Sequence, residues 1–189
     1  MEKIGILFSG GLESTSLIIN YFELKPELLY IKYGYIWEEA ESYYAKKIAK
    51  HFGVNLTILD RKLPNLKQLG FVKDVKSNII LMRNLSLIVD GAFYFVNNNI
   101  FNVAIGLFGD KNYPDTSLEY LTKLEELISL GVNKKFNILL PFYGLNKEIV
   151  FKRFKNKLPI NLIFSCANPI GLERCHKCYK CKKLDELIN

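Results

Sequence analysis

Cysteine is absent from the first 165 residues of this 189-residue chain, and histidine occurs only twice. With so little histidine, no Ser-His-Asp or Cys-His pattern for nucleophilic catalysis is visible. No uninterrupted apolar run approaches the roughly 20 residues that a membrane-spanning helix needs. The N-terminus also lacks the long apolar region and cleavage site of a signal peptide. We therefore expect a cytoplasmic protein with no membrane partner.

The composition is that of a globular chain with a moderate positive charge. Hydrophobic residues make up 49% of the sequence, and the formal net charge is +7. A basic surface can attract polyanions, but much of the excess lies in two polar stretches, 147–157 and 174–183, that need no partner to explain them. The charge therefore does not require nucleic acid as a ligand.

Short apolar strands alternate with amphipathic helices along most of the chain. The expected strands are 3–8, 28–33, 55–59, 103–106 and 138–140. The expected helices are 14–22, 37–52, 83–97, 118–130 and one that begins near Lys147 after an Asn146 cap. This alternation predicts an α/β fold, a five-stranded parallel sheet with helices on both faces, which binds ligands at the carboxyl ends of its strands.

The residues after the first expected strand suit an anion-binding loop. Glycines let backbone N–H groups approach phosphate oxygens, and a following helix adds the partial positive charge of its N-terminus. The loop lacks the Lys-Ser/Thr pair of a Walker A loop and the third glycine of a Rossmann fingerprint. An ordinary glycine-rich turn is the alternative. The candidate nucleotide-binding residues are Phe8, Ser9, Gly10, Gly11, Leu12, Glu13, Ser14 and Thr15.

All four cysteines, Cys166, Cys175, Cys178 and Cys181, lie within sixteen residues, with the spacing C-x8-C-x2-C-x2-C. The two C-x2-C steps bring three thiolates together at a tight turn, and Cys166 can supply the fourth from a loop. This spacing predicts a tetrahedral structural zinc site, with His176 facing solvent. Disulfides are not expected in a cytosolic protein. An iron–sulfur cluster is the alternative, because C-x2-C-x2-C also occurs in ferredoxin-type sites. We expect residues 1–165 to form a nucleotide-binding domain and 166–189 a small zinc-binding lobe.

The order Ser-Gly-Gly-x-acid-Ser after a strand resembles the PP-loop of the ATP pyrophosphatase superfamily. Members of that superfamily generally activate a substrate as an adenylate and release pyrophosphate. Their usual pattern has aspartate where this chain has Glu13. Glutamate keeps the negative charge of aspartate and is one methylene longer.

The PP-loop and the cysteine spacing together resemble the 7-cyano-7-deazaguanine synthase family of the queuosine and archaeosine pathways. The resemblance spans nearly the whole chain, and the cysteine spacing is its most specific part. Thr116-Ser117 stand where the family commonly has Cys-Arg. The intervening segments that match the family are Tyr33-Gly34, Arg83-Asn84, Tyr113-Pro114-Asp115, and Pro141 with Lys147-Glu148.

The resemblance implies an ATP-dependent ligase that converts 7-carboxy-7-deazaguanine and ammonia to 7-cyano-7-deazaguanine through an adenylated intermediate. It also implies a homodimer. The loop would cradle the pyrophosphate end of ATP, and Glu13 would help to hold magnesium. Arg83 would neutralise phosphate charge, Asp115 would accept donors from the guanine-like edge of the base, and Lys147 would face the phosphates or the substrate carboxylate.

Each of these roles has a plainer alternative. Arg83 and Asn84 could pair at a helix start, Asp115 could be a turn residue after proline, and Lys147 could be a surface lysine. For the whole protein, one alternative is a PP-loop adenylating enzyme that acts on another base or on tRNA. A non-catalytic paralogue that binds ATP and zinc is the other.

Overall fold

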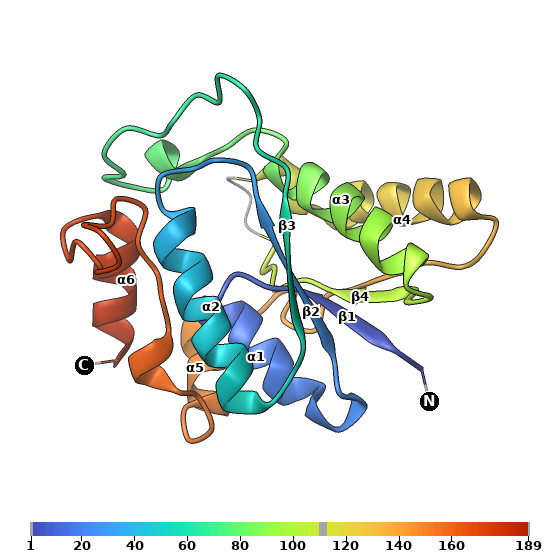
Figure 1. Ribbon diagram of the computed structural model, residues 1–189, viewed down its shortest axis with the longest axis horizontal. Helices are drawn as coiled ribbons and strands as arrows, with labels where there is room; N and C mark the ends of the chain where they lie inside the picture. Colours follow the sequence, from blue (N-terminus) through green and yellow to red (C-terminus); the bar gives the residue numbers. More distant parts are fainter. Residues whose placement is uncertain (1, 110–112, 189) are drawn as a thin grey trace.

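The computed structural model of the chain describes residues 2–109 and 113–188. Five parallel strands form one sheet in the order β3-β2-β1-β4-β5 (Figure 1). The strands are β1 (Ile4–Leu7), β2 (Glu27–Lys32), β3 (Leu56–Asp60), β4 (Asn102–Ala104) and β5 (Asn137–Leu139). The helices are α1 (Leu12–Asn20), α2 (Glu38–Phe52), α3 (Arg83–Asn97), α4 (Leu118–Val132), α5 (Lys147–Phe154) and α6 (Tyr179–Ile188). The predicted α/β fold, with five parallel strands between two helical layers, is confirmed.

The two helical layers cover opposite faces of the sheet. Helices α1, α2, α5 and α6 lie on one face, and α3 and α4 lie on the other (Figure 1). Successive side chains of a strand point to opposite faces, so each strand serves both layers. In β2, Leu28 and Tyr30 pack under the first layer, whereas Leu29 and Ile31 pack under the second. The strands are therefore apolar on both sides, as a parallel sheet requires.

Local sequence explains where several helices begin. Asn146 caps α5 as predicted, since its side chain accepts a hydrogen bond from the Ile149 N–H at 2.8 Å. Ser117 caps α4 in the same way through Tyr120. Helix α1 begins at Leu12, two residues before the predicted start, because Gly11 already occupies the cap position and Glu13 suits a first turn.

The segment Lys76–Asn97 has the length and apolar composition of a membrane-spanning helix, a feature that the sequence analysis did not single out. In the structure α3 forms most of this segment. Ile88, Ala92 and Phe95 pack against the sheet, and Asp90 interrupts the apolar surface. These contacts are those of a helix that packs one face on a sheet, and its other face is exposed.

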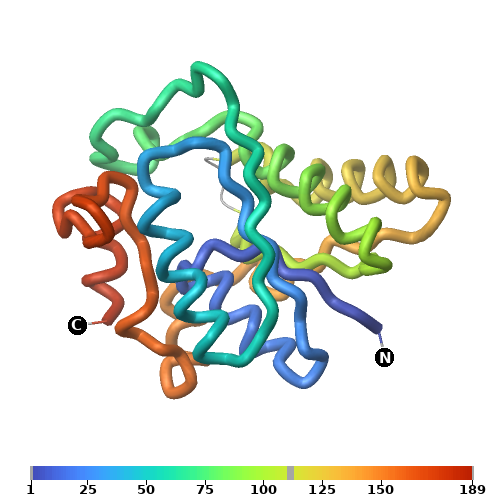
Figure 2. Tube along the Cα trace, viewed as in Figure 1, coloured from blue at the N-terminus to red at the C-terminus, as the bar shows by residue number. Residues whose placement is uncertain are grey.

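The residues after Phe164 run back along the first helical layer. Figure 2 shows this C-terminal segment beside α2 and below the long connection between β3 and α3. Cys166, Cys178 and Cys181 are buried in one cluster with Trp37 of the β2–α2 turn and Val72 of that connection. The Tyr179 N–H donates to the Val72 carbonyl at 2.9 Å, which ties the start of α6 to the connection. Helix α6 itself was not predicted from the sequence.

Replacing Gly5 with alanine should destabilise the fold, because a Cβ atom there would lie 2.5 Å from the ring of Phe95. Overpacking of this kind costs about 1–3 kcal/mol in the free energy of unfolding, which urea denaturation measures. Gly131→Ala in α4 is the matched control, since a Cβ atom there has no neighbour within 4 Å. Equal stability of the two variants would contradict the packing described for β1.

Candidate functional site

The main cavity opens where β1 and β4 end side by side. From these neighbouring strands the chain leaves towards opposite helical layers, so their loops separate and leave a crevice between them. The cavity is lined by Leu7, Phe8, Ser9, Glu13, Ser14, Leu29, Tyr30, Ile31, Glu41, Arg83, Asn84, Leu87, Ile105, Gly106 and Leu107. It thus brings together the predicted phosphate loop and the predicted Arg83-Asn84 pair, which are about 70 residues apart in the sequence.

The phosphate loop is held by hydrogen bonds among its own serines. The Ser9 N–H donates to Ser14 Oγ at 3.2 Å, and the Gly11 N–H donates to Ser9 Oγ at 3.3 Å. No side chain of the described residues caps α1 at Gly11. The first amides of the helix therefore remain available to an anion, which the helix dipole favours.

Two glycines let the backbone pack closely around this loop. Gly10 has a φ of +75°, and a Cβ atom there would lie 3.3 Å from the backbone of Ala45 in α2. Gly106, after β4, approaches α1 so closely that a Cβ atom would lie 2.8 Å from Cβ of Glu13. Gly10 was predicted as part of the loop. Gly106 was expected only as the end of a strand.

Glu13 and Lys147 form an ion pair across the helices α1 and α5. Lys147 Nζ lies 2.9 Å from Glu13 Oε1, and both side chains are largely buried. Lys147 is therefore more than a surface lysine at a helix start, because it reaches the first turn of α1 beside the phosphate loop. This pair leaves the second carboxylate oxygen of Glu13 for another cation.

Asp115 belongs to the short 3-10 turn Pro114–Thr116, which lies against the start of α3. Its two carboxylate oxygens accept hydrogen bonds from the N–H and the side-chain amide of Asn84, both at 3.0 Å. These bonds place a negative charge at the N-terminus of α3, next to Arg83 in the sequence. Asn84 thus hydrogen-bonds to both carboxylate oxygens of Asp115. The predicted contact of Asp115 with a base stays a prediction.

Arg83 also lines a second cavity, whose other walls are mostly apolar and aromatic. Tyr33, Tyr35, Leu63, Leu66, Lys67, Gln68, Leu69, Ile79, Ile80, Leu81 and Ser86 line it together with Arg83. Burial raises the pKa of Tyr35, and the positive charge of Arg83 opposes that rise. The side chain of Arg83 thus stands between a cavity that suits phosphates and one that suits a flat ring.

The turn that carries Tyr33 and Tyr35 is held by a buried carboxylate. Glu38 accepts backbone hydrogen bonds from Tyr33, Gly34 and Tyr35 at 2.7–3.1 Å. Burial raises the pKa of Glu38, and the three backbone N–H groups act against that rise. Tyr33 is fixed further by a 3.0 Å hydrogen bond from its hydroxyl to Asp90.

Glu41 and Tyr30 line the main cavity, and the sequence analysis missed both. The hydroxyl of Tyr30 donates to Glu41 Oε2 at 2.8 Å in a buried contact. Burial, followed by the charge of Glu41, raises the pKa of Tyr30. A signal for Glu41 was present in the sequence, since it shares one helix face with Ala45 and Ile48, which are fully buried.

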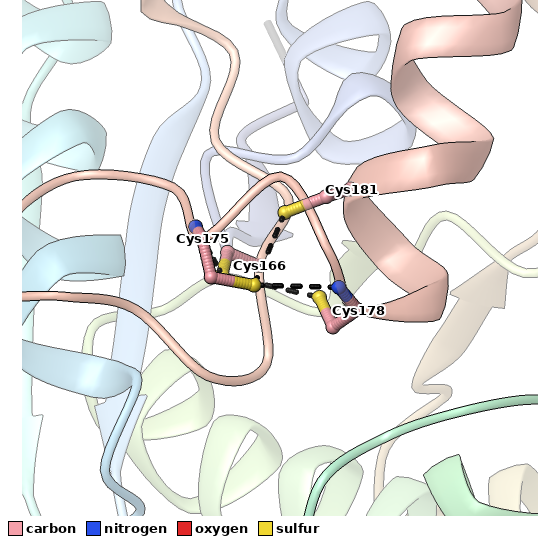
Figure 3. A group of neighbouring side chains, drawn as sticks. All are labelled: Cys166, Cys175, Cys178 and Cys181. Atoms are coloured by element: carbon pink, nitrogen blue, oxygen red, sulfur yellow. Dashed lines mark hydrogen bonds between the residues drawn. The ribbon is translucent and has the colours of Figure 1, made fainter.

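The four cysteines converge on one point. Their sulfur atoms all lie within 4.8 Å of one another, and Figure 3 shows them turned towards a common centre. The Cys166–Cys178 and Cys175–Cys181 sulfur distances are both 3.9 Å. Four sulfurs bound tetrahedrally to one zinc ion would be about 3.8 Å apart. The cluster therefore fits a single metal ion, and His176 is exposed beside it, as predicted.

The protein environment does not stabilise four thiolates in the absence of a cation. Burial raises the pKa of Cys166 to about 11, and it also raises that of Cys181. Burial also acts to raise the pKa of Cys178. Hydrogen bonds from the backbone at Ala167 and Cys181 outweigh this effect and lower the pKa to about 7. A bound divalent cation would favour the charged form of all four.

The metal cluster and the phosphate loop are directly connected. The Phe164 N–H, two residues before Cys166, donates to the Gly10 carbonyl at 3.2 Å. Arg174 binds the Cys181 carbonyl at 2.9 Å and Asp185 at 2.7 Å, which fixes the cysteine turn to α6. The cysteine segment thus supports the loop that forms one wall of the main cavity.

Comparison with known proteins assigns the family. A family profile described as "Queuosine biosynthesis protein QueC" matches residues 3–186. The chain belongs to this family. The 7-cyano-7-deazaguanine synthase 1 of Desulfitobacterium hafniense (strain Y51) is 27% identical over 206 residues, which cover 99% of this chain and 91% of that protein. The 7-cyano-7-deazaguanine synthase of Picrophilus torridus is 30% identical, with coverages of 96% and 84%. The family predicted from the sequence is confirmed.

Solved structures with this fold include two enzymes that use other substrates. The U34-tRNA thiolase NcsA from Methanococcus maripaludis, described with its 4Fe–4S cluster, has a TM-score of 0.55 at 16% identity and covers 98% of this chain and 64% of its own. The NMN synthetase from Francisella tularensis has a TM-score of 0.51 at 15% identity, with coverages of 93% and 71%. At these identities the likeness shows the fold alone.

Cys175→Ser should abolish stoichiometric metal binding and lower the melting temperature by several degrees, because three ligands no longer complete the tetrahedron. Elemental analysis and calorimetry measure the two effects. His176→Ala, in the same turn, is the matched control and should keep its metal, since His176 faces solvent. Loss of metal from His176→Ala but not from Cys175→Ser would contradict the assigned ligand set.

Proposed function

We propose that the chain is an ATP-dependent ligase that converts 7-carboxy-7-deazaguanine and ammonia to 7-cyano-7-deazaguanine. The observation that carries this proposal is the cavity in which the uncapped amides of α1 face Arg83. Membership of the QueC family, and relatives that are 7-cyano-7-deazaguanine synthases, support the product of this reaction. The apolar cavity on the far side of Arg83 would receive the flat deazapurine ring.

The chemistry requires an oxygen of the substrate carboxylate to become a leaving group. Attack of that oxygen on the α-phosphorus of ATP forms an acyl adenylate and releases pyrophosphate. Ammonia displaces AMP from the acyl carbon to give the amide. The amide oxygen then attacks the α-phosphorus of a second ATP and releases a second pyrophosphate. Loss of AMP and of the protons on nitrogen leaves the nitrile. The protein would contribute positioning and charge stabilisation at the phosphorus.

The residues of the cavity divide these tasks. The residues Phe8 to Thr15 would cradle the pyrophosphate end of ATP, and Arg83 would bind the α-phosphate next to the substrate carboxylate. Glu13, held by Lys147, would bind magnesium through its second oxygen. Lys147 would add positive charge near the released pyrophosphate. Asp115 would act through Asn84 by fixing the start of α3, in addition to any contact with the base.

We propose zinc as the metal of the cysteine cluster, with a structural role in a lobe formed by residues 166–189. The sulfur separations of 3.9 Å support one ion. An iron–sulfur cluster, whose iron and sulfide atoms fill the space between the ligands, requires its cysteine sulfurs to stand farther apart. Four thiolates leave no open position for a substrate or for water.

The purified enzyme, given 7-carboxy-7-deazaguanine, ATP, magnesium and ammonium, should form the nitrile, detected by mass spectrometry together with AMP and pyrophosphate. Arg83→Ala should lower kcat by about a hundredfold, because a preorganised donor to the developing phosphate charge is lost. Lys123→Ala on the exposed face of α4 is the control and should be fully active. ATP turnover without nitrile would refute the substrate, and modification of tRNA or another base would then identify the alternative.

We also propose that the chain forms a homodimer through the outer surface of α3 and α4. Phe93 and Leu127 are each 66% exposed, and Val89 and Leu130 are exposed nearby on the same helices. Exposed apolar side chains that gather on adjoining helices are typical of an interface.

The double variant Phe93→Lys, Leu127→Lys should therefore be monomeric at concentrations at which the unaltered chain is dimeric, because each copy would bury charges against the other. Light scattering after gel filtration measures the mass. A dimer that survives both changes would place the interface elsewhere, and a monomeric unaltered chain would end the proposal.

A further inference from the structure

Glu41 is a buried carboxylate in the wall of the main cavity. It lies in α2, is 7% exposed, and lines the cavity beside Tyr30 of β2. The hydroxyl of Tyr30 donates to Glu41 Oε2 at 2.8 Å and so fixes the direction of the carboxylate. Within residues 2–109 and 113–188, no other donor bonds to the Glu41 side chain. Its Oε1 atom is therefore available to a ligand in the cavity.

The two carboxylates that line the main cavity differ in their partners. Glu13 forms an ion pair with Lys147, whereas Glu41 forms none with a cation of the described residues. Arg83 lies in the same cavity wall, and burial lowers the pKa of Lys180 while the charge of Glu41 opposes this. These two cations offset part of the charge of Glu41 from beyond ion-pair distance. Because the bonded partner of Glu41 is a neutral hydroxyl, the carboxylate can accept a proton without breaking an ion pair.

The other polar side chains of the cavity wall come from the phosphate loop with the start of α1, and from the start of α3. Apart from Glu13, which is paired, they are neutral hydroxyls, an amide and an arginine, and none of these is a base near neutral pH. Formation of the amide requires a proton to leave the attacking nitrogen. Among the described residues that line this wall, Glu41 is the group left to take that proton.

We propose that Glu41 is the general base of carbon–nitrogen bond formation. The proposal rests on the proposed function, because the acyl adenylate of that reaction is the group that ammonia attacks. The nitrogen lone pair forms the bond to the acyl carbon, Glu41 Oε1 takes one N–H proton, and the C–O bond to AMP breaks with its electron pair on AMP. The products are the amide, AMP and protonated Glu41, which returns its proton to water. Tyr30 is a positioning residue that holds the carboxylate in place.

Glu41→Gln tests this proposal, because glutamine keeps an acceptor for the Tyr30 hydroxyl and has no basic oxygen. In the absence of ammonium, the variant should bind ATP and 7-carboxy-7-deazaguanine as the unaltered protein does, and release pyrophosphate at the same rate. After ammonium is added, the amide should form at least about a hundredfold more slowly, the usual effect of losing a general base. Rapid-quench measurements of pyrophosphate and of the amide separate the two steps.

Hydroxylamine in place of ammonium gives a second readout. It is a weaker base than ammonia, so its nitrogen gives up a proton more readily once it has attacked the acyl carbon. The hydroxamate should therefore form in Glu41→Gln with a much smaller deficit than the amide does. A carboxylate that only supports the fold would lower both rates alike.

Glu39→Gln is the matched control, since Glu39 lies in the same helix, is exposed, pairs with Lys32 and does not line the cavity. It should form the amide as fast as the unaltered protein. Slower pyrophosphate release or weaker binding of either ligand in Glu41→Gln would overturn the proposal, because Glu41 would then hold magnesium or the deazapurine ring. No deficit, or equal deficits with ammonium and hydroxylamine, would also overturn it. An unaltered protein that forms neither pyrophosphate nor amide refutes the reaction itself, and the base with it.

Discussion

The divergence of the chain at the ends of β1 and β4 is the constraint on which the rest of the molecule depends. The loops after these two parallel strands lead to helices on opposite faces of the sheet, so the loops move apart. A crevice therefore forms at the carboxyl ends of the strands. The uncapped start of α1 borders one side of it, and the start of α3 borders the other. The backbone topology alone thus gives an anion-binding position, and the side chains decide which anion is bound and what happens to it.

A buried carboxylate, Glu38, and a half-buried one, Asp115, position the residues around this site. Glu38 gathers three backbone amides of the turn that carries Tyr33 and Tyr35, and Asp115 holds the first residues of α3. Glu38 accepts only backbone N–H groups, and Asp115 accepts one backbone N–H and one side-chain amide. These donors replace water, which offsets the cost of burial and favours one conformation for the turn or helix start. The cations and rings that face the ligands are therefore held in place before any ligand binds.

Much of this arrangement could be predicted from the sequence, since strand and helix periodicity, the glycine loop and the cysteine spacing are local signals. The pairing of Glu13 with Lys147 could not, because it depends on how α1 and α5 pack after the whole sheet has formed. The same holds for the contact of Asp115 with Asn84, because it depends on how the turn after β4 packs against the start of α3. Glu41 had a weak signal, a carboxylate on a buried helix face, which becomes informative only when the opposing strand and its Tyr30 are known.

The hydrogen bond from Phe164 to Gly10 has a consequence for the order of events during synthesis. The phosphate loop leaves the ribosome among the first residues, but one of the groups that fix it is made more than 150 residues later. The nascent chain therefore carries an incomplete loop until the cysteine segment emerges. With the proposed zinc, a chain made without the metal would have a formed sheet and an unfinished first loop, so that the metal would act on maturation as well as on stability.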